Sequence, residues 1–83
     1  MKLQEYQNEF DTINGPGVIP ADCNSITFIN TGAAAMQING INISPSAQLV
    51  ISGNADELDV TRYRLSFTGT AGNSCTVIRK IYK

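Results

Sequence analysis

The chain has 83 residues and a formal net charge of −1, with 42% hydrophobic and 16% charged residues. This length allows one domain with a modest core, and the composition is that of a globular chain rather than a disordered one. No apolar run is long enough to span a membrane, and the absence of histidine removes the commonest general base and most zinc sites.

The first 24 residues differ from the rest in their periodicity. Apolar side chains recur at steps of three and four, the spacing of one helix face, at Leu3, Tyr6, Phe10 and Ile13. The Gly-Pro-Gly run at 15–17 would end such a helix. We therefore expect residues 1–24 to form an N-terminal arm or a short helix, docked on its own domain or on another subunit. No apolar run follows the first lysine, so we expect no secretory signal.

From residue 25 onward the period changes to two, which is typical of half-buried strands. The expected strands or strand pairs are 25–30, 36–43, 47–51, 61–67 and 74–83. Short strands separated by turn signals every 8–12 residues indicate a compact sandwich or barrel. We expect residues 25–83 to form an all-β domain, a small antiparallel β-sandwich (jelly-roll or Ig-like) of about six to eight strands.

The stretch "MQINGINI" (36–43) predicts a hairpin in detail. Asn39-Gly40 lies between alternating apolar residues, and this dipeptide favours a type I′ turn, which needs positive φ at both central positions. That register pairs Ile38 with Ile41 and Met36 with Ile43, with all four on one side of the ribbon. Such a turn fixes strand register, which a small core cannot leave loose.

No motif assembles a catalytic site. Cys23 and Cys75 lack the CxxC spacing of a redox or metal motif, and nothing around 15–17 resembles a phosphate loop. Asn54, Asp56, Glu57 and Asp59 could gather Ca²⁺, but their spacing matches no EF-hand loop, and we expect a solvated turn. We predict no enzymatic activity, no cofactor and no metal.

Two questions stay open at this level. The two cysteines either form a disulfide across a long loop or remain buried free thiols, as expected in a cytosolic product.

The formal charge of residues 1–59 is −6 (one lysine, seven acids), and that of residues 60–83 is +5 (five cations, no acid). Either basic strands face acidic loops within one molecule, or copies attract one another head to tail. Five cations without an aromatic platform do not favour nucleic-acid binding.

The aromatic residues bear on a carbohydrate-binding or adhesion module, the alternative function. Phe28, Tyr63 and Phe67 fall at apolar-face positions and are expected in the core. Tyr6, Phe10 and Tyr82 remain near the termini, too few and too dispersed in the sequence for a sugar-binding platform.

Five segments together carry a family resemblance: "ITFINTG" (26–32), "INGINISP" (38–45), "ISGNADELD" (51–59), "YRLSFTG" (63–69) and "VIRKIYK" (77–83). The pattern resembles small β proteins encoded by tailed bacteriophages, including crAss-like ones. It covers residues 26–83, and Pro45-Ser46 stands where Pro-Gly is expected, so that turn can differ.

The resemblance implies a virion structural role. The chain would be made in the host cytoplasm and reside in the virion, bound in several copies to the capsid, a head fibre or the tail. The implied partners are other virion proteins and further copies of the chain, with no nucleic acid and no membrane. The expected contact positions lie in the arm and the basic end strand: Leu3, Tyr6, Phe10, Arg79, Lys80 and Tyr82.

Overall fold

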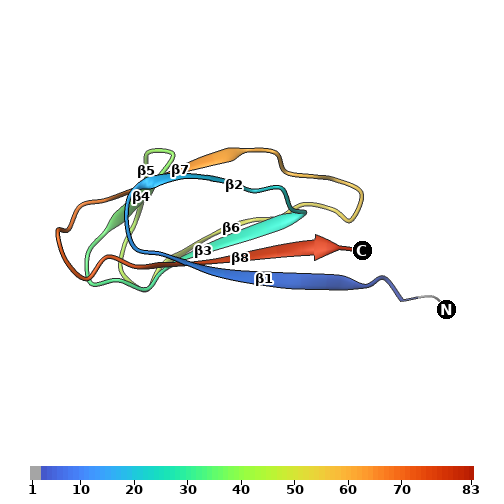
Figure 1. Cartoon of the computed structure of the whole chain (residues 1–83), viewed down its shortest axis with the longest axis horizontal. Helices are drawn as coiled ribbons and strands as arrows, with labels where there is room; N and C mark the ends of the chain where they lie inside the picture. Colours follow the sequence, from blue (N-terminus) through green and yellow to red (C-terminus); the bar gives the residue numbers. More distant parts are fainter. Residues whose placement is uncertain (1–2) are drawn as a thin grey trace.

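Eight strands in two four-stranded antiparallel sheets make up the computed structural model, which describes residues 3–83 (Figure 1). In chain order the strands are β1 (Tyr6–Ile13), β2 (Gly17–Pro20), β3 (Ser25–Asn30), β4 (Met36–Ile38), β5 (Ile41–Ile43), β6 (Gln48–Ile51), β7 (Arg62–Phe67) and β8 (Cys75–Tyr82). The first sheet has the order β1-β8-β3-β6 and the second the order β2-β7-β4-β5. The expected all-β sandwich is confirmed. Residues 3–83 contain no helix long and apolar enough to cross a membrane.

The N-terminal segment contributes a strand to each sheet. β1 pairs with β8 along its whole length, from Tyr6 opposite Tyr82 to Ile13 opposite Cys75, and β2 pairs with β7. The helical alternative for the arm is therefore wrong. A helix of this length is marginal without a docking surface, whereas pairing with β8 gives every β1 residue a cross-strand neighbour.

The core lies between the sheets and is filled from alternate strand positions, as a period of two requires. It contains Ile26, Phe28 and Val77 from the first sheet and Met36, Ile38, Tyr63 and Leu65 from the second. The rings of Phe28 and Tyr63 meet edge to face across the two layers, with centroids 5.1 Å apart. The predicted inward positions of these side chains on β3 and β7 are confirmed.

The β4–β5 hairpin has the predicted register and turn. Met36 lies opposite Ile43 and Ile38 opposite Ile41, and φ is 49° at Asn39 and 84° at Gly40. The Asn39 side chain also accepts a hydrogen bond from the Arg64 backbone N–H at 2.8 Å, which ties the turn to β7. Ile41 departs from the prediction because β5 is an edge strand, which leaves its side chain 53% exposed.

Both cysteines are buried and free, so the disulfide alternative is not realised. Burial raises the pKa of both thiols, Cys23 and Cys75, and so favours the neutral form at physiological pH. They serve as small core residues, one just before β3 and one at the start of β8.

Two carboxylates of the acidic loop, those of Glu57 and Asp59, accept hydrogen bonds from the chain itself. Glu57 accepts a hydrogen bond from the Asn54 N–H at 3.0 Å. Asp59 accepts one from the Thr61 N–H at 2.8 Å and another from the Tyr63 hydroxyl at 2.6 Å. Within residues 3–83 no three acidic or cysteine side chains gather in a metal-binding arrangement. The hydrogen bonds of Glu57 and Asp59 shape this loop.

The Tyr63–Asp59 hydrogen bond predicts a loss of stability at alkaline pH. Burial, together with the adjacent Asp59 carboxylate, raises the pKa of Tyr63 to about 12. An unfolded tyrosine ionises near pH 10, so between about pH 10 and 12 the folded chain binds the extra proton and stability falls as pH rises. The expected loss across this window is about 3 kcal/mol.

Urea unfolding of the chain and of Tyr63→Phe over this pH range measures the effect. The variant lacks the titrating hydroxyl, so only the parent chain should lose this stability. The unfolding free energy of the parent minus that of the variant should therefore fall by about 3 kcal/mol between about pH 10 and 12. A difference that stays constant from neutral to strongly alkaline pH contradicts the assignment.

Candidate interaction face

The outer face of the first sheet gathers exposed aromatic and apolar side chains. Val77 on β8 is buried in the core, so Ile78 and Lys80 point to the opposite side of the strand. The cross-strand pairing places Phe10 and Tyr82 on that same side. We call this surface the aromatic face; its residues are Tyr6, Phe10, Thr27, Val50, Ile78, Lys80 and Tyr82.

A lysine and two tyrosines form the polar end of the aromatic face. Tyr6 and Tyr82 are directly opposite each other, with ring centroids 6.0 Å apart and planes inclined at 63°. The Lys80 Nζ lies 4.2 Å from the Tyr6 ring centroid and 5.1 Å from that of Tyr82. At an exposed site such a cation–ring contact contributes about 0.5–1 kcal/mol. The cluster therefore presents a positioned cation between two rings.

A row of three apolar side chains and one threonine crosses the sheet beside this cluster. Phe10 on β1 lies opposite Ile78 on β8, Ile78 opposite Thr27 on β3, and Thr27 opposite Val50 on β6. The two ends of the row are open to solvent, since Phe10 is 67% and Val50 52% exposed. Scattered exposed apolar residues are normal, but a contiguous patch on a rigid sheet indicates an interaction surface.

Four of the six expected contact residues lie on the aromatic face: Tyr6, Phe10, Lys80 and Tyr82. Leu3 precedes β1 and is 78% exposed, beside a shallow hollow that it lines with Glu5, Tyr6 and Lys83. The residues that line this hollow come from the segment before β1, from the start of β1 and from the position that follows β8, and these two strands run side by side (Figure 1). Five of the six residues are therefore on or next to one surface.

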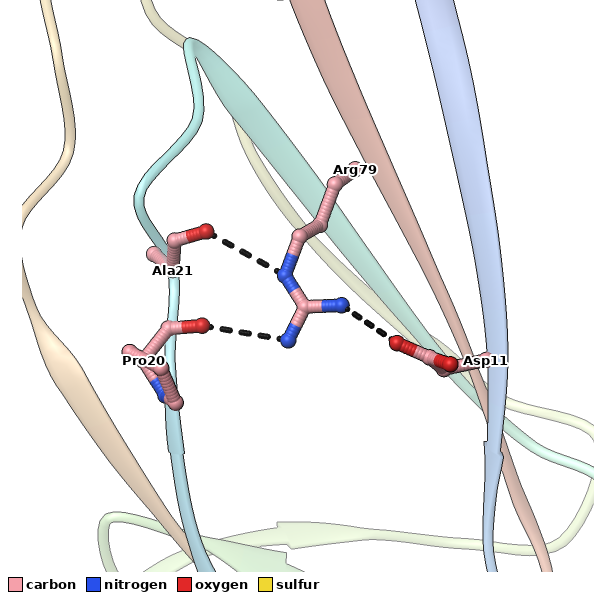
Figure 2. A network of polar contacts seen from close by, with 4 residues as sticks. All are labelled: Asp11, Pro20, Ala21 and Arg79. Carbon is pink, nitrogen blue, oxygen red and sulfur yellow. Dashed lines mark hydrogen bonds and ion pairs between the residues drawn. The ribbon is translucent and has the colours of Figure 1, made fainter.

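Arg79 is separated from the other five because it points between the sheets, where its side chain is 12% exposed. Figure 2 shows its guanidinium reaching from β8 towards the β2 end of the second sheet and towards Asp11 on β1. It donates to the Ala21 and Pro20 carbonyls at 3.2 and 3.1 Å and to the Asp11 carboxylate at 2.7 Å. In this ion pair, a positive charge from the basic C-terminal part of the chain is balanced by a negative charge from the acidic N-terminal part of the same molecule.

Three members of the aromatic face were not among the expected contact residues: Thr27, Val50 and Ile78. Ile78 follows the buried Val77, so the strand is apolar on both faces. The second apolar face is the sequence feature that indicates Ile78 as a contact residue. Thr27 joins the row through the pairing of β3 with β8, and Val50 through the pairing of β3 with β6. Neither pairing is encoded in local periodicity.

The outer face of the second sheet has different chemistry. Ser66 and Gln37 are linked by a hydrogen bond at 3.1 Å, and Gln37 donates to Asn42 at 2.9 Å. Further along, Val18 on β2 lies opposite Arg64 on β7. This face is polar and basic, and it provides a matched surface for control substitutions.

Comparison of the chain with protein-family models, with curated proteins and with solved structures found no match. The chemistry of the aromatic face is that of a paired sheet with a partly exposed row of mostly apolar side chains and a cation held between two tyrosine rings.

Proposed function

We propose that the chain is a non-enzymatic structural protein that attaches to a larger assembly through its aromatic face. The observation that carries this proposal is the continuous row Phe10–Ile78–Thr27–Val50, exposed at both ends and half-buried in the middle, beside the Tyr6–Lys80–Tyr82 cluster. Interfaces are enriched in aromatic side chains, and a sheet holds them in place at a low entropic cost on binding. The surface suits a protein partner better than a small molecule, which would need a concave site.

The finer form of the proposal is a multi-copy virion protein of a tailed bacteriophage, attached to the capsid, a head fibre or the tail. Its support is the resemblance of residues 26–83 to small phage β proteins. The aromatic face adds the physical means of attachment. The partner would offer an apolar strip, with a carboxylate or carbonyl oxygens placed to meet the Lys80 ammonium group.

Density-gradient purification of particles from a lysate of the encoding phage tests this proposal. We expect the chain to band with the particles in several copies, as measured by quantitative mass spectrometry. Added as purified protein to particles lacking the chain, Phe10→Ser and Tyr82→Ser should each bind at least about thirtyfold more weakly, the effect of losing an interface anchor of about 2 kcal/mol.

Val18→Ser is the matched control, because Val18 is a 47% exposed strand residue on the other sheet. It should leave particle binding unchanged. The virion role is contradicted if the chain stays in the soluble fraction of the gradient. The assignment of the attachment surface is contradicted if Val18→Ser weakens binding as much as Phe10→Ser.

A carbohydrate-binding module is the second candidate, and one observation favours it. Tyr6 and Tyr82 are far apart in the sequence but have ring centroids only 6.0 Å apart in the fold, so the expected dispersal of the terminal aromatics does not hold in space. However, the Lys80 ammonium group lies over both rings, where a sugar would stack.

The variant Lys80→Ala separates the two candidates. It uncovers both rings, so a sugar-binding site should take up soluble oligosaccharides more tightly, as measured by calorimetry. A protein-attachment face loses its cation and should bind particles more weakly. Tighter sugar binding with unchanged particle binding would favour the second candidate.

A further inference from the structure

We propose that two copies of the chain pair edge to edge through β1, across a two-fold axis at Asn8, and so join their first sheets into one eight-stranded sheet. This inference goes beyond the proposed function, because such a pair can form whether or not the chain belongs to a virion. It rests on the direction of the backbone groups of β1, on the position of β1 in the sheet and on the charges that limit its register.

Alternate β1 residues turn their backbone N–H and C=O groups away from β8. The Lys80 carbonyl accepts a hydrogen bond from the Asn24 N–H at 2.9 Å, and the Tyr82 N–H donates to the Asn24 side chain at 2.8 Å. Both β8 residues thus direct backbone groups towards the β3 side, so Asn8 and Tyr6, which lie opposite them, direct theirs outward. The Lys83 N–H donates to the Glu5 carbonyl at 2.9 Å. Glu5, next to Tyr6, therefore directs its carbonyl to the β8 side, as the alternation requires.

This outward-facing edge is long and has no neighbour among residues 3–83. β1 is the terminal strand of its sheet, and seven of its eight residues are exposed. Extended edges of this kind pair with another chain unless they are shortened, bulged, covered, or carry proline or charged side chains, lysine above all. β1 is paired without interruption over Tyr6–Ile13 and contains neither proline nor lysine; its two charged residues, Glu9 and Asp11, limit the register of pairing.

The charges of β1 restrict how two antiparallel copies can align, because like charges directly opposite each other are destabilising. An axis at Glu9 sets the two copies of Glu9 against each other, and an axis at Gln7 sets Glu5 against Glu9 of the second copy. With the axis at Asn8, Glu9 faces Gln7. One kind of like-charged contact remains, Glu5 facing Asp11, and the symmetry repeats it; in both cases the Asp11 carboxylate is already bound by Arg79 at 2.7 Å.

The same register places apolar side chains together. Tyr6 faces Phe10 of the second copy on the outer side of the sheet, and this contact occurs twice because of the two-fold symmetry. Leu3, the 78% exposed residue before β1, faces Ile13, which packs against the edge of the core. Tyr6, Asn8 and Phe10 then satisfy their outward backbone groups, and the two aromatic faces form one surface.

Light scattering behind size exclusion tests the pair over a series of protein concentrations. The parent chain should approach twice its mass of 8.9 kDa as concentration rises. Asn8→Pro removes an N–H that points away from β8 and leaves the bonds to β8 intact, so it should stay folded while the dissociation constant rises at least about tenfold. Asn8→Asp sets two carboxylates face to face at the axis and should also weaken the pair.

Asn8→Thr keeps the N–H and suits a strand, so it should dimerise like the parent. A parent chain that is monomeric up to its solubility limit overturns the proposal. So does an Asn8→Asp variant that dimerises as tightly as the parent, and this variant decides the matter if Asn8→Pro does not fold. A chain that dimerises through β1 but never bands with particles leaves this inference standing and removes the proposed virion role.

Discussion

Arg79→Met is expected to lower the free energy of unfolding by about 3 kcal/mol, the scale of breaking hydrogen bonds made by a charged group. The guanidinium bridges β8 in the first sheet to the carbonyls of Pro20, which ends β2 in the second sheet, and of the following Ala21. Ala21 is 1% exposed, so its carbonyl has little access to water as a replacement donor. Methionine retains most of the side-chain volume and removes all five N–H donors.

Asp11→Asn separates the ion pair from the carbonyl contacts. The Asp11 side chain is 57% exposed, so its bond to Arg79 is screened by solvent, and its loss should cost no more than about 1 kcal/mol. Urea unfolding at neutral pH gives both values from shifts in the midpoint at constant slope. Equal, small losses in the two variants would mean that the bonds to Pro20 and Ala21 contribute nothing measurable.

Asn30→Ala is expected to destabilise the chain by a similar amount, about 3 kcal/mol, because it leaves buried backbone groups without partners. Asn30 is 1% exposed and ends β3. Its amide donates to the Ala34 and Ile43 carbonyls, both at 2.9 Å, and its oxygen accepts from the Gly32 N–H at 3.0 Å. One side chain thus holds the turn after β3 and the end of β5.

The shape of this turn also explains Gly32. A Cβ at that position would lie 2.6 Å from the Gly72 carbonyl oxygen and 2.7 Å from the Ser74 nitrogen, so only glycine allows the approach.

Asn30→Asp is the isosteric comparison for Asn30→Ala. At neutral pH its carboxylate cannot donate to the two carbonyls, so it should be at least as destabilising as alanine. A loss below about 1 kcal/mol in both variants would contradict this role for Asn30.

The local sequence pattern was sufficient to predict those strands that have one apolar and one polar face. The alternation in 25–30 and 61–67 correctly predicted the burial of Phe28 and Tyr63, and Asn39-Gly40 correctly predicted the hairpin. The N-terminal segment was ambiguous because Tyr6 and Phe10, four residues apart, lie on one face of a strand as well as of a helix. What decides between them is pairing with β8, at the other end of the chain.

Only part of the candidate site could be predicted, because the pairing of strands that are distant in the sequence decides which side chains meet. Tyr6 and Tyr82 were named as separate contact residues, but only the β1–β8 register brings them together around Lys80. Arg79 and Lys80 look alike as a basic pair in the sequence. Strand alternation sends their side chains to opposite faces, so one joins the sheets while the other lies on the aromatic face.

Hydroxyl-radical footprinting of the chain, free and bound to particles, tests the central claim most directly. If the aromatic face is the attachment surface, Phe10 and Tyr82 should be oxidised much less in the bound chain than in the free chain at the same concentration. Val18 and Leu58, which are 47% and 62% exposed elsewhere on the molecule, should be oxidised equally in both states. Protection of Val18 or Leu58, with Phe10 and Tyr82 unchanged, would contradict the account.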